Sequence, residues 1–250
     1  MPSKPYASTA LLKDCGWQCA AYCVAIRGAA RVTTLFHSSM QLIDIHTHSV
    51  KTDGNIHIAD VGTDAIYNTL CSVGIHPWKI SAGWREDFDR ITGIAANGCV
   101  TAIGECGFDL LKSPATEEEQ YRIFLLHAEL SESLQKPLII HLVKGLQLLL
   151  KAAKEFPHTQ AWIIHGFRGK AQQAQQLLSA GTHISLGEHF NADTAATIPA
   201  DRLFIESDES TMPLHDIYAR IATARGCSVE ELAKHITANA LGCNLLKRGY

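Results

Sequence analysis

The sequence predicts an α/β fold, a TIM-type (β/α)8 barrel that is small for its class. Short β-branched or apolar runs recur eight times from residue 41 onward, and most are separated by segments with apolar residues at helical spacing. Strands that alternate with helices pair in parallel, and eight of them favour closure into a barrel. The chain has 250 residues and 46% hydrophobic side chains, which suffices for a sizeable core.

The eight expected strands are apolar runs bounded by turn residues. They lie near residues 41–48, 55–61, 68–75, 100–105, 137–143, 161–166, 183–187 and 202–208. Only about seven residues separate the first two runs, too few for a helix that crosses over between parallel strands. Either the barrel therefore lacks its first crossover helix, or the second run is not a strand.

Helical patterns occupy most of the other connections. The clearest begins at Thr116, where Thr116 followed by Glu119 is the signature of a capping box, and Pro137 restarts the chain as a strand. Further helices are expected at 84–96, 144–155, 170–180, 212–225 and 228–241. The last of these also begins with a capping box.

The first 40 residues differ in composition from the rest. They carry a charge of +3, whereas residues 41–250 carry −6. We expect an N-terminal extension, 1–40, that is disordered or arises from an upstream translation start, followed by one barrel domain, 41–250. Cys15, Cys19 and Cys23 would share one helix face there, but no nearby histidine or fourth cysteine completes a tetrahedral metal site.

Composition excludes several classes of protein. No apolar run reaches the roughly 18 to 20 residues that a membrane span needs. A net charge of −3 and a pI near 6.5 provide no global basic field for nucleic acid, so only a local basic patch could serve. The eight cysteines form no disulfide framework and indicate reduced thiols in a cytoplasmic protein. The sequence is silent on oligomeric state.

Histidines and carboxylates recur where the expected strands end. His46 and His48 close the first run one residue apart, so they point to the same side of an extended strand. Five later runs end in His76, Glu105, His141, His165 and Asp208. Because the carboxyl ends of barrel strands meet on one face, these side chains should converge. Burying so many polar groups is costly unless a cation compensates them, which predicts a metal site.

The motifs around these residues also resemble a known family. In order they are Ile-Asp-Ile-His-Thr-His, Gly-Ile-His-Pro-Trp, Ala-Ile-Gly-Glu-Cys-Gly-Phe-Asp, Ile-Ile-His, Ile-His-Gly-Phe and Glu-Ser-Asp. The series resembles that of the TatD family of metal-dependent hydrolases, over residues 41 to about 245. The resemblance implies a barrel hydrolase with one or two divalent ions and, for its best-known members, deoxyribonuclease activity.

The same resemblance implies two ligand sets that share Glu105. The first would be His46, His48, Glu105 and Asp208, and the second would be Glu105, His141 and His165. His76 would line the pocket.

The chemistry of hydrolysis fits these residue types independently. Two cations about 3.5 to 4 Å apart can hold the attacking and leaving oxygens of an in-line displacement, and they lower the pKa of a shared water. Asp208 is the expected general base. His76, with Arg168 or Lys170, would assist at the phosphate oxygens, although a solvated helix start explains Arg168 and Lys170 equally well. The metal stays open among zinc, manganese and magnesium.

Two residues near the expected site have two interpretations each. Glu206 could orient a metal ligand or form a structural ion pair. Trp78 could stack on a base or merely cover the mouth of the barrel. The remaining histidines, among them His57 and His127, have no converging partner in the sequence and are left out of the site.

Three functions are compatible with the sequence. The preferred one is a divalent-metal phosphodiesterase, a 3′ exodeoxyribonuclease acting on single-stranded DNA. The alternative is a metal-dependent amidohydrolase or esterase for a small molecule or an aminoacyl adduct, because the same activated water attacks a carbonyl. A non-catalytic barrel used as an interaction module would leave the ligand set unexplained. A basic rim with exposed aromatic rings favours the first, and a narrow, neutral pocket favours the second.

Overall fold

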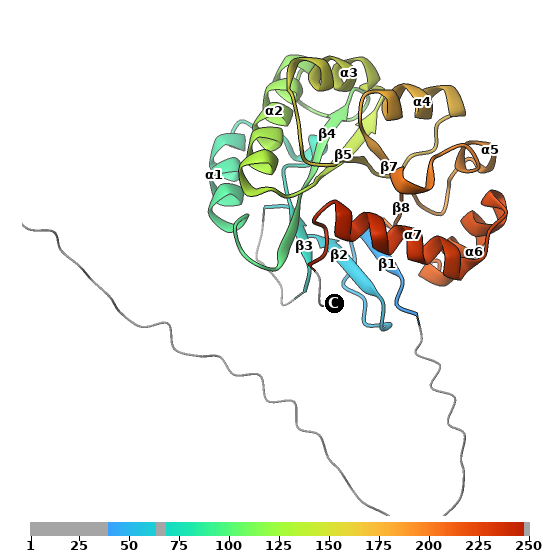
Figure 1. Ribbon diagram of the computed structural model, residues 1–250. Coiled ribbons are helices and arrows are strands. Elements are labelled where there is room, and N and C mark those ends of the chain that lie inside the picture. Colours follow the sequence, from blue (N-terminus) through green and yellow to red (C-terminus); the bar gives the residue numbers. More distant parts are fainter. Residues whose placement is uncertain (1–39, 64–68, 248–250) are drawn as a thin grey trace, which may run out of the picture. The chain divides into compact units, whose positions relative to one another are not determined.

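A computed structural model describes residues 40–63 and 69–247 of the chain. Eight parallel strands form one sheet in the order β1 to β8, and helices surround it (Figure 1). The first and last strands meet at Asp208, whose N–H donates to the His46 carbonyl (2.9 Å) and whose carbonyl accepts from the His48 N–H (3.2 Å). The predicted TIM-type (β/α)8 barrel is therefore confirmed, as a nearly closed barrel.

All eight expected strands are present. They are β1 (Ile43–Thr47), β2 (Ile56–Asp60), β3 (Cys71–Val73), β4 (Val100–Asp109), β5 (Leu138–Val143), β6 (Trp162–Ile164), β7 (His183–Leu186) and β8 (Leu203–Ile205). The largest difference from the expected bounds is in β4, which continues four residues beyond Glu105. Its pairing with β5 resumes at Cys106, after an irregularity in register that follows Ile103.

The helices follow the expected pattern. They are α1 (Trp84–Ile94), α2 (Glu117–Leu134), α3 (Leu146–Glu155), α4 (Ala171–Ser179), α5 (Ala192–Ala195), α6 (Leu214–Arg225) and α7 (Val229–Gly242), with short 3-10 helices at Pro77–Lys79 and Ala200–Arg202. The capping box before α2 is formed, because Thr116 and Glu119 accept from each other's backbone N–H groups. The four-residue α5 and the two 3-10 helices are too short to produce a periodic sequence pattern, and they were not predicted.

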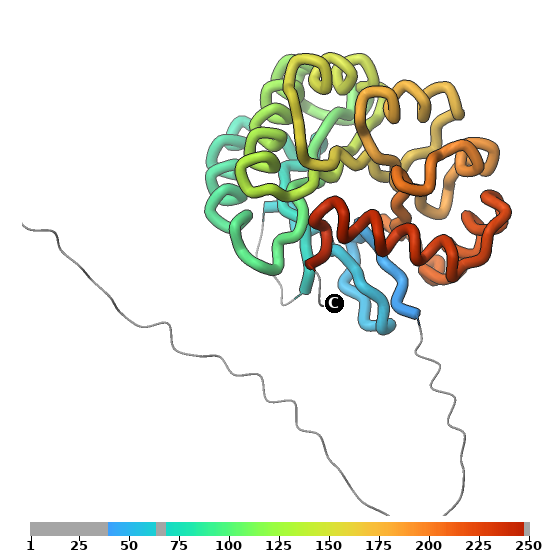
Figure 2. Tube along the Cα trace, viewed as in Figure 1, coloured from blue at the N-terminus to red at the C-terminus, as the bar shows by residue number. Residues whose placement is uncertain are grey.

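The flank between β1 and β2 has no crossover helix. Residues 48–55, all of which the structure describes, form a loop, and the Cα trace turns directly from one strand into the next (Figure 2). The two strands are nevertheless parallel and pair Ile43 with Ile56. The second apolar run is thus a strand, and the missing helix is the correct alternative.

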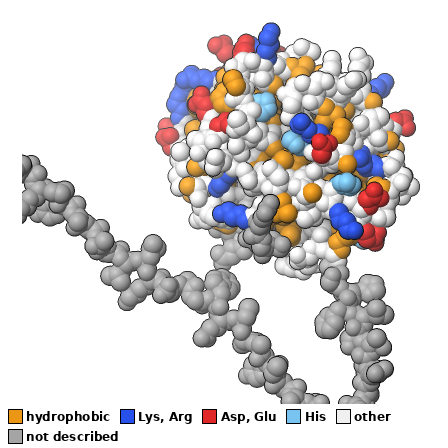
Figure 3. All heavy atoms as spheres, viewed as in Figure 1, with side chains coloured by type: hydrophobic (Ala, Val, Ile, Leu, Met, Phe, Trp, Pro, Cys, Tyr) orange, Lys and Arg blue, Asp and Glu red, His pale blue; other side chains and the backbone are white. Residues whose placement is uncertain are grey.

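The surface carries charged side chains of both signs. Lysine, arginine, aspartate and glutamate side chains are interspersed on the face drawn in Figure 3, as the small net charge suggests. Among the described residues, no helix combines the length and the apolar character that crossing a bilayer requires. The predictions for residues 1–40, including the three cysteines, lie outside the described residues except for Met40.

Candidate metal centre

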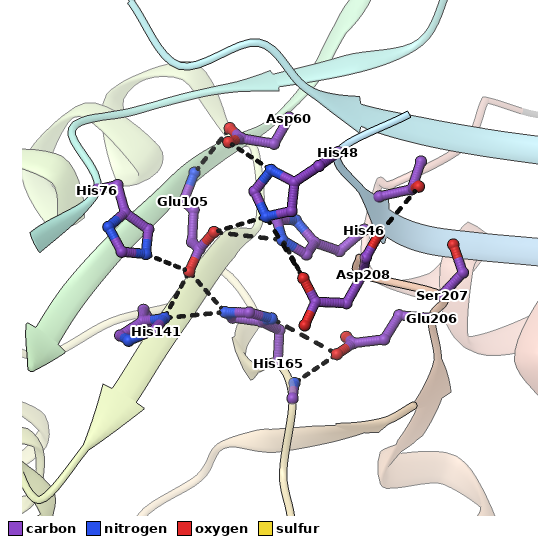
Figure 4. Close-up of polar contacts among 12 residues, drawn as sticks. His46, His48, Asp60, His76, Glu105, His141, His165, Glu206, Ser207 and Asp208 are labelled. Atoms are coloured by element: carbon purple, nitrogen blue, oxygen red, sulfur yellow. Dashed lines mark hydrogen bonds and ion pairs between the residues drawn. The ribbon is translucent and has the colours of Figure 1, made fainter. Parts of the chain in front are cut away.

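Seven side chains from six parts of the barrel point into one small volume at the carboxyl ends of the strands (Figure 4). They are His46, His48, His76, Glu105, His141, His165 and Asp208. The structure thus brings together every predicted ligand and the predicted pocket residue. The loops and strand ends that carry them lie up to 162 residues apart in the sequence, from His46 to Asp208.

Glu105 lies at the centre of this group and is only 1% exposed. Its Oε1 atom faces three imidazoles, at 2.6 Å from His141 Nδ1, 2.7 Å from His165 Nε2 and 3.1 Å from His76 Nε2. His76 therefore lies as close to the carboxylate as the predicted ligands do. Together with Glu105 and His141, it forms one group of potential ligand atoms within 4.8 Å of one another.

The other oxygen of Glu105 faces the pair of histidines from β1. Oε2 lies 3.3 Å from His46 Nε2 and 3.7 Å from His48 Nε2. The same two imidazoles approach Asp208 Oδ1, at 3.9 Å from His46 Nε2 and 3.4 Å from His48 Nε2. His46, His48 and Asp208 form a second group of potential ligand atoms within 4.8 Å. A bridging position for Glu105 is consistent with this geometry.

The charge state of the centre is set by this packing. Burial alone would raise the pKa of Glu105, but the charge of His165 and the close contacts with His141, His165 and His46 hold it well below its usual value. Burial would lower the pKa of His165, yet Glu105 and Glu206 raise it well above its usual value. In the metal-free chain the buried carboxylate is therefore paired with imidazolium, which a bound cation would replace.

Asp208 follows β8 and has a left-handed backbone, with φ of 53°. Burial raises the pKa of its carboxyl group, but the hydrogen bond with His48 and the nearby His165 and His46 lower it to about 2. The preceding residue, Ser207, is held in place because it donates its N–H (2.8 Å) and its hydroxyl (2.6 Å) to the buried Asp44 carboxylate. The backbone of Asp208 is thus fixed on both sides.

Several buried polar atoms of the centre lack a hydrogen-bond partner within the chain. They are His46 Nδ1 and Nε2, Glu105 Oε2, His165 Nδ1 and Glu206 Oε2. Such groups cost free energy unless they are satisfied. Imidazole nitrogens and carboxylate oxygens are ligands of zinc and manganese, and the carboxylates also suit magnesium. The donor set therefore fits divalent cations, and the buried clusters of His, Glu and Asp are able to bind metal.

Asp60 is a member of the site that sequence reasoning missed. It ends β2, and its Oδ1 accepts the Glu105 N–H (3.3 Å) while Oδ2 lies 3.6 Å from His48 Nδ1 (Figure 4). Asp60 thus orients both a central carboxylate and an imidazole. Its position at a strand end, the same signal that identified the other residues, could have indicated it.

Two further carboxylates contact imidazoles of the centre. Glu206 is fully buried, accepts the N–H of Gly166 and lies 3.5 Å from His165 Nδ1. Asp109, also missed by sequence reasoning, lies 3.3 Å from His141 Nε2. A carboxylate behind an imidazole fixes its orientation and tautomer.

The centre opens into a cleft of about 890 Å³. Four cationic side chains line it, Lys79, Lys112, Lys144 and Arg168. The cleft lining does not include Lys170, which instead precedes α4 as its N-cap. A neighbouring hollow of about 350 Å³ is lined by Glu188, Glu206, Asp208 and Glu209, together with Arg168. Arg168, Asp208 and Glu209 line both spaces, so the lysines belong to the cleft alone, and Glu188 and Glu206 belong to the hollow alone.

Comparison with known proteins gives a consistent result. The family described as TatD related DNase matches residues 28–243. The chain is 28% identical over 207 residues to an uncharacterized metal-dependent hydrolase, YcfH, of Escherichia coli, covering 74% of this chain and 77% of that protein. It is also 28% identical over 180 residues to a protein of Pectobacterium parmentieri named 3′-5′ ssDNA/RNA exonuclease TatD, covering 66% of this chain and 68% of that protein.

The solved structures agree on the fold. The TatD homologue YjjV of Escherichia coli superposes with a TM-score of 0.70 at 19% identity. The match covers 83% of this chain and 99% of that one. At this identity the similarity concerns the barrel alone.

Proposed function

The chain belongs to the TatD-related DNase family of metal-dependent hydrolases, and we propose that it hydrolyses phosphodiester bonds in single-stranded nucleic acid, as a 3′ exodeoxyribonuclease. The name of the Pectobacterium parmentieri relative supports this assignment. The observation that carries it is the cleft at the metal centre, where four cationic side chains line the space beside the ligand cluster although the whole protein is acidic. Lysine and arginine side chains at such a site attract the phosphate backbone.

The proposed ligand roles follow the two carboxylate oxygens of Glu105. We assign His46, His48, Glu105 and Asp208 to one divalent ion, and Glu105, His141 and His165 to a second. When bound, such ions neutralise phosphate charge and lower the pKa of a water molecule. Zinc, manganese and magnesium all remain compatible with this set of ligands.

Asp208 acts as the general base in this proposal. With a pKa of about 2 its carboxylate is ionised at neutral pH, so it can accept the proton of the attacking water. The backbone contacts to His46 and His48 hold it in place while it does so. His76 and Arg168, which both line the cleft, would donate to the phosphate oxygens and stabilise the charge that builds up during displacement.

The alternative function, hydrolysis of an amide or ester in a small molecule, requires a different cleft. A narrow and neutral pocket would favour it, whereas the observed cleft has a volume of about 890 Å³ and its lining includes Lys79, Lys112 and Lys144. The reaction chemistry alone does not separate the two functions, since the same centre can attack a carbonyl.

An oligonucleotide assay tests the proposal. Single-stranded DNA labelled at either end is incubated with the purified protein and Mg²⁺, Mn²⁺ or Zn²⁺ in turn, beside Glu105→Ala, Asp208→Asn and a control, Glu118→Gln, whose side chain is exposed on α2. We expect stepwise loss of nucleotides from the 3′ end, and roughly 100- to 10,000-fold slower cleavage by the two site variants. Equal cleavage by all four proteins indicates contamination and contradicts the proposal.

A parallel arm tests the alternative function. Activated esters and N-acylated amino acids replace the oligonucleotide under the same conditions. Turnover of these compounds without any cleavage of DNA would favour the amidohydrolase or esterase assignment.

We also propose that the protein acts in the cytoplasm. The five cysteines among the described residues are free thiols, which is the usual state in a reducing compartment.

A further inference from the structure

We propose that Trp78 is the platform on which the nucleobase next to the scissile phosphate stacks, an inference that rests on the proposed nuclease function. Trp78 lies in the 3-10 helix Pro77–Lys79 and lines the cleft of the metal centre. Its ring contacts that of His76 edge-on, with centroids 4.8 Å apart, and His76 in turn approaches Glu105 (Figure 4). A base on this ring would therefore lie beside the reacting phosphate.

The exposure of Trp78 distinguishes it from the tryptophans of the core. Trp84 and Trp162 are buried, with 7% and 0% exposure. Trp78 is instead 44% exposed. A large aromatic surface is thus left in water at the edge of the cleft, where a planar ligand can cover it.

The indole is held by its edge, so its orientation is fixed without packing on both faces. Its N–H donates to Asp109 Oδ2, and Asp109 is itself fixed because its other oxygen accepts the N–H groups of Leu111 (2.8 Å) and Lys112 (2.9 Å). A ring that is already oriented loses little conformational entropy when a ligand binds.

One face of the ring is occupied by a charge that can move aside. The Lys112 ammonium lies 4.3 Å from the ring centroid. Because it stands on a flexible stem, a base can take its place, and the ammonium can then pair with a neighbouring phosphate. Aromatic faces beside mobile cations are typical of surfaces that bind single-stranded nucleic acid without reading its sequence.

The distribution of charge favours this side of the centre for the strand. Lys79 and Lys112 flank Trp78, whereas the neighbouring hollow shares Arg168, Asp208 and Glu209 with the cleft and adds Glu188 and Glu206 but no lysine. A polyanion would be repelled from the hollow and attracted along the cleft. The strand should therefore leave the metal centre over Trp78.

Binding of matched oligonucleotides tests this assignment independently of catalysis. The affinity of the full chain with Ca²⁺ or Mg²⁺ is measured for a labelled, phosphorothioate-protected single strand, either intact or with one abasic residue at each of the three positions from the 3′ end. The proteins are wild type, Trp78→Phe, Trp78→Ala and the control Leu111→Ala, which removes an exposed apolar side chain from a neighbouring loop.

At one of the three abasic positions, we expect the wild type to bind the abasic strand about 5- to 150-fold more weakly than the intact strand. This is the range expected for the loss of one base stack. Trp78→Ala should bind the intact strand equally weakly and no longer distinguish the two. Trp78→Phe, which keeps an aromatic face but not the indole N–H, should retain much of the difference, and Leu111→Ala all of it.

The results distinguish a failure of the stacking role of Trp78 from a failure of the nuclease assignment. If the wild type cleaves DNA but Trp78→Ala keeps the full abasic penalty, the nuclease assignment stands and the stacking role of Trp78 is wrong. If the wild type neither cleaves nor binds single strands, both assignments are wrong.

Discussion

At the scale of single residues, the most unusual feature is a buried carboxylate that faces five imidazoles. Glu105 provides the negative charge, and His46, His48, His76, His141 and His165 surround it. Desolvation of so many polar groups opposes folding, and ion pairing offsets only part of the cost. Binding of a divalent cation by these side chains would offset more of that cost.

Ser207 gives a first test of how Asp208 is held. Ser207→Ala removes a short hydrogen bond to the buried Asp44 carboxylate, which should lower the free energy of unfolding by about 1.5 to 3 kcal/mol. Urea denaturation at pH 7 measures this loss. The control is Ser210→Ala, whose hydroxyl donates to the partly exposed Glu188 and should contribute less. Equal losses in both variants would contradict a special role for the Asp44 contact.

Residue-level prediction from sequence succeeds where a strand end carries an unusual side chain. Seven histidine or acid positions stood out because such side chains rarely end an apolar run. Asp60 did not stand out, since an aspartate before Val-Gly also suits a turn. Asp109 was missed because the expected strand stopped at Glu105, four residues too early. Which carboxylate supports which imidazole depends on contacts between strands, which no local pattern encodes.

At the scale of elements, the residues that follow α2 and α6 share a left-handed backbone conformation. Gln135 is the C-cap of α2 and has a φ of 54°, and Gly226 is the C-cap of α6 and has a φ of 68°. A side chain in this left-handed region costs free energy that glycine avoids.

Exchanging the residue types at these two positions should therefore have opposite effects. Gln135→Gly should raise the free energy of unfolding by about 0.5 to 1 kcal/mol, and Gly226→Ala should lower it by a similar amount. A Cβ at Gly226 meets no atom within 4 Å, so the backbone conformation alone determines the result. Urea denaturation of both variants measures the effects, and changes of the same sign would refute the argument.

A buried histidine ties α2 to the strand that precedes the site. His127 Nε2 accepts the N–H of Ile75 (3.0 Å), and Nδ1 donates to the Ile123 carbonyl (2.8 Å). The ring must be neutral to accept at Nε2. Burial lowers the pKa of His127 to about 4. Ile75 immediately precedes His76, so this contact positions one side of the centre.

This histidine predicts a loss of stability in acid. Between the ordinary pKa of 6.5 and the folded-state value of about 4, the unfolded chain binds a proton at His127 that the folded chain does not, so the free energy of unfolding falls as the pH falls. The full effect is about 3 kcal/mol and is complete below pH 4. The advantage of the wild type over His127→Gln, measured by urea denaturation, should shrink across this range. An advantage that is constant from pH 7 to pH 4 would contradict the assignment.

The elements themselves were largely predictable. All strands and the long helices follow from hydrophobic periodicity and capping signatures such as Thr116 with Glu119. The extent of β4 was not predictable, because Gly107, just after the expected end at Glu105, resembles a strand terminator in the sequence. In the barrel Gly104 and Gly107 both adopt positive φ values inside the strand, with the β5 backbone in close contact.

At the scale of the whole molecule, metal binding should be coupled to stability. Cations that bind only the folded chain stabilise it by about 2.7 kcal/mol at 100 times their dissociation constant. For a chain of this size we expect Tm to rise by about 5 to 10 °C when Mn²⁺ or Zn²⁺ is added after treatment with a chelator. Differential scanning fluorimetry measures the shift.

Two variants make this measurement specific. Glu105→Gln removes the charge shared by both proposed ions and should abolish most of the shift. Glu118→Gln, on the exposed face of α2, should retain it. A shift of the same size in both proteins would place the responsible metal elsewhere.

The contact between β1 and Asp208 has a consequence for biosynthesis. A nascent chain leaving the ribosome exposes His46 and His48 early, but the carboxylate that joins them is encoded 160 residues beyond His48. The seam of the barrel and its hydrolytic centre therefore close in the same late event. A translation product that stops before residue 208 should therefore lack hydrolase activity, whatever metal is present.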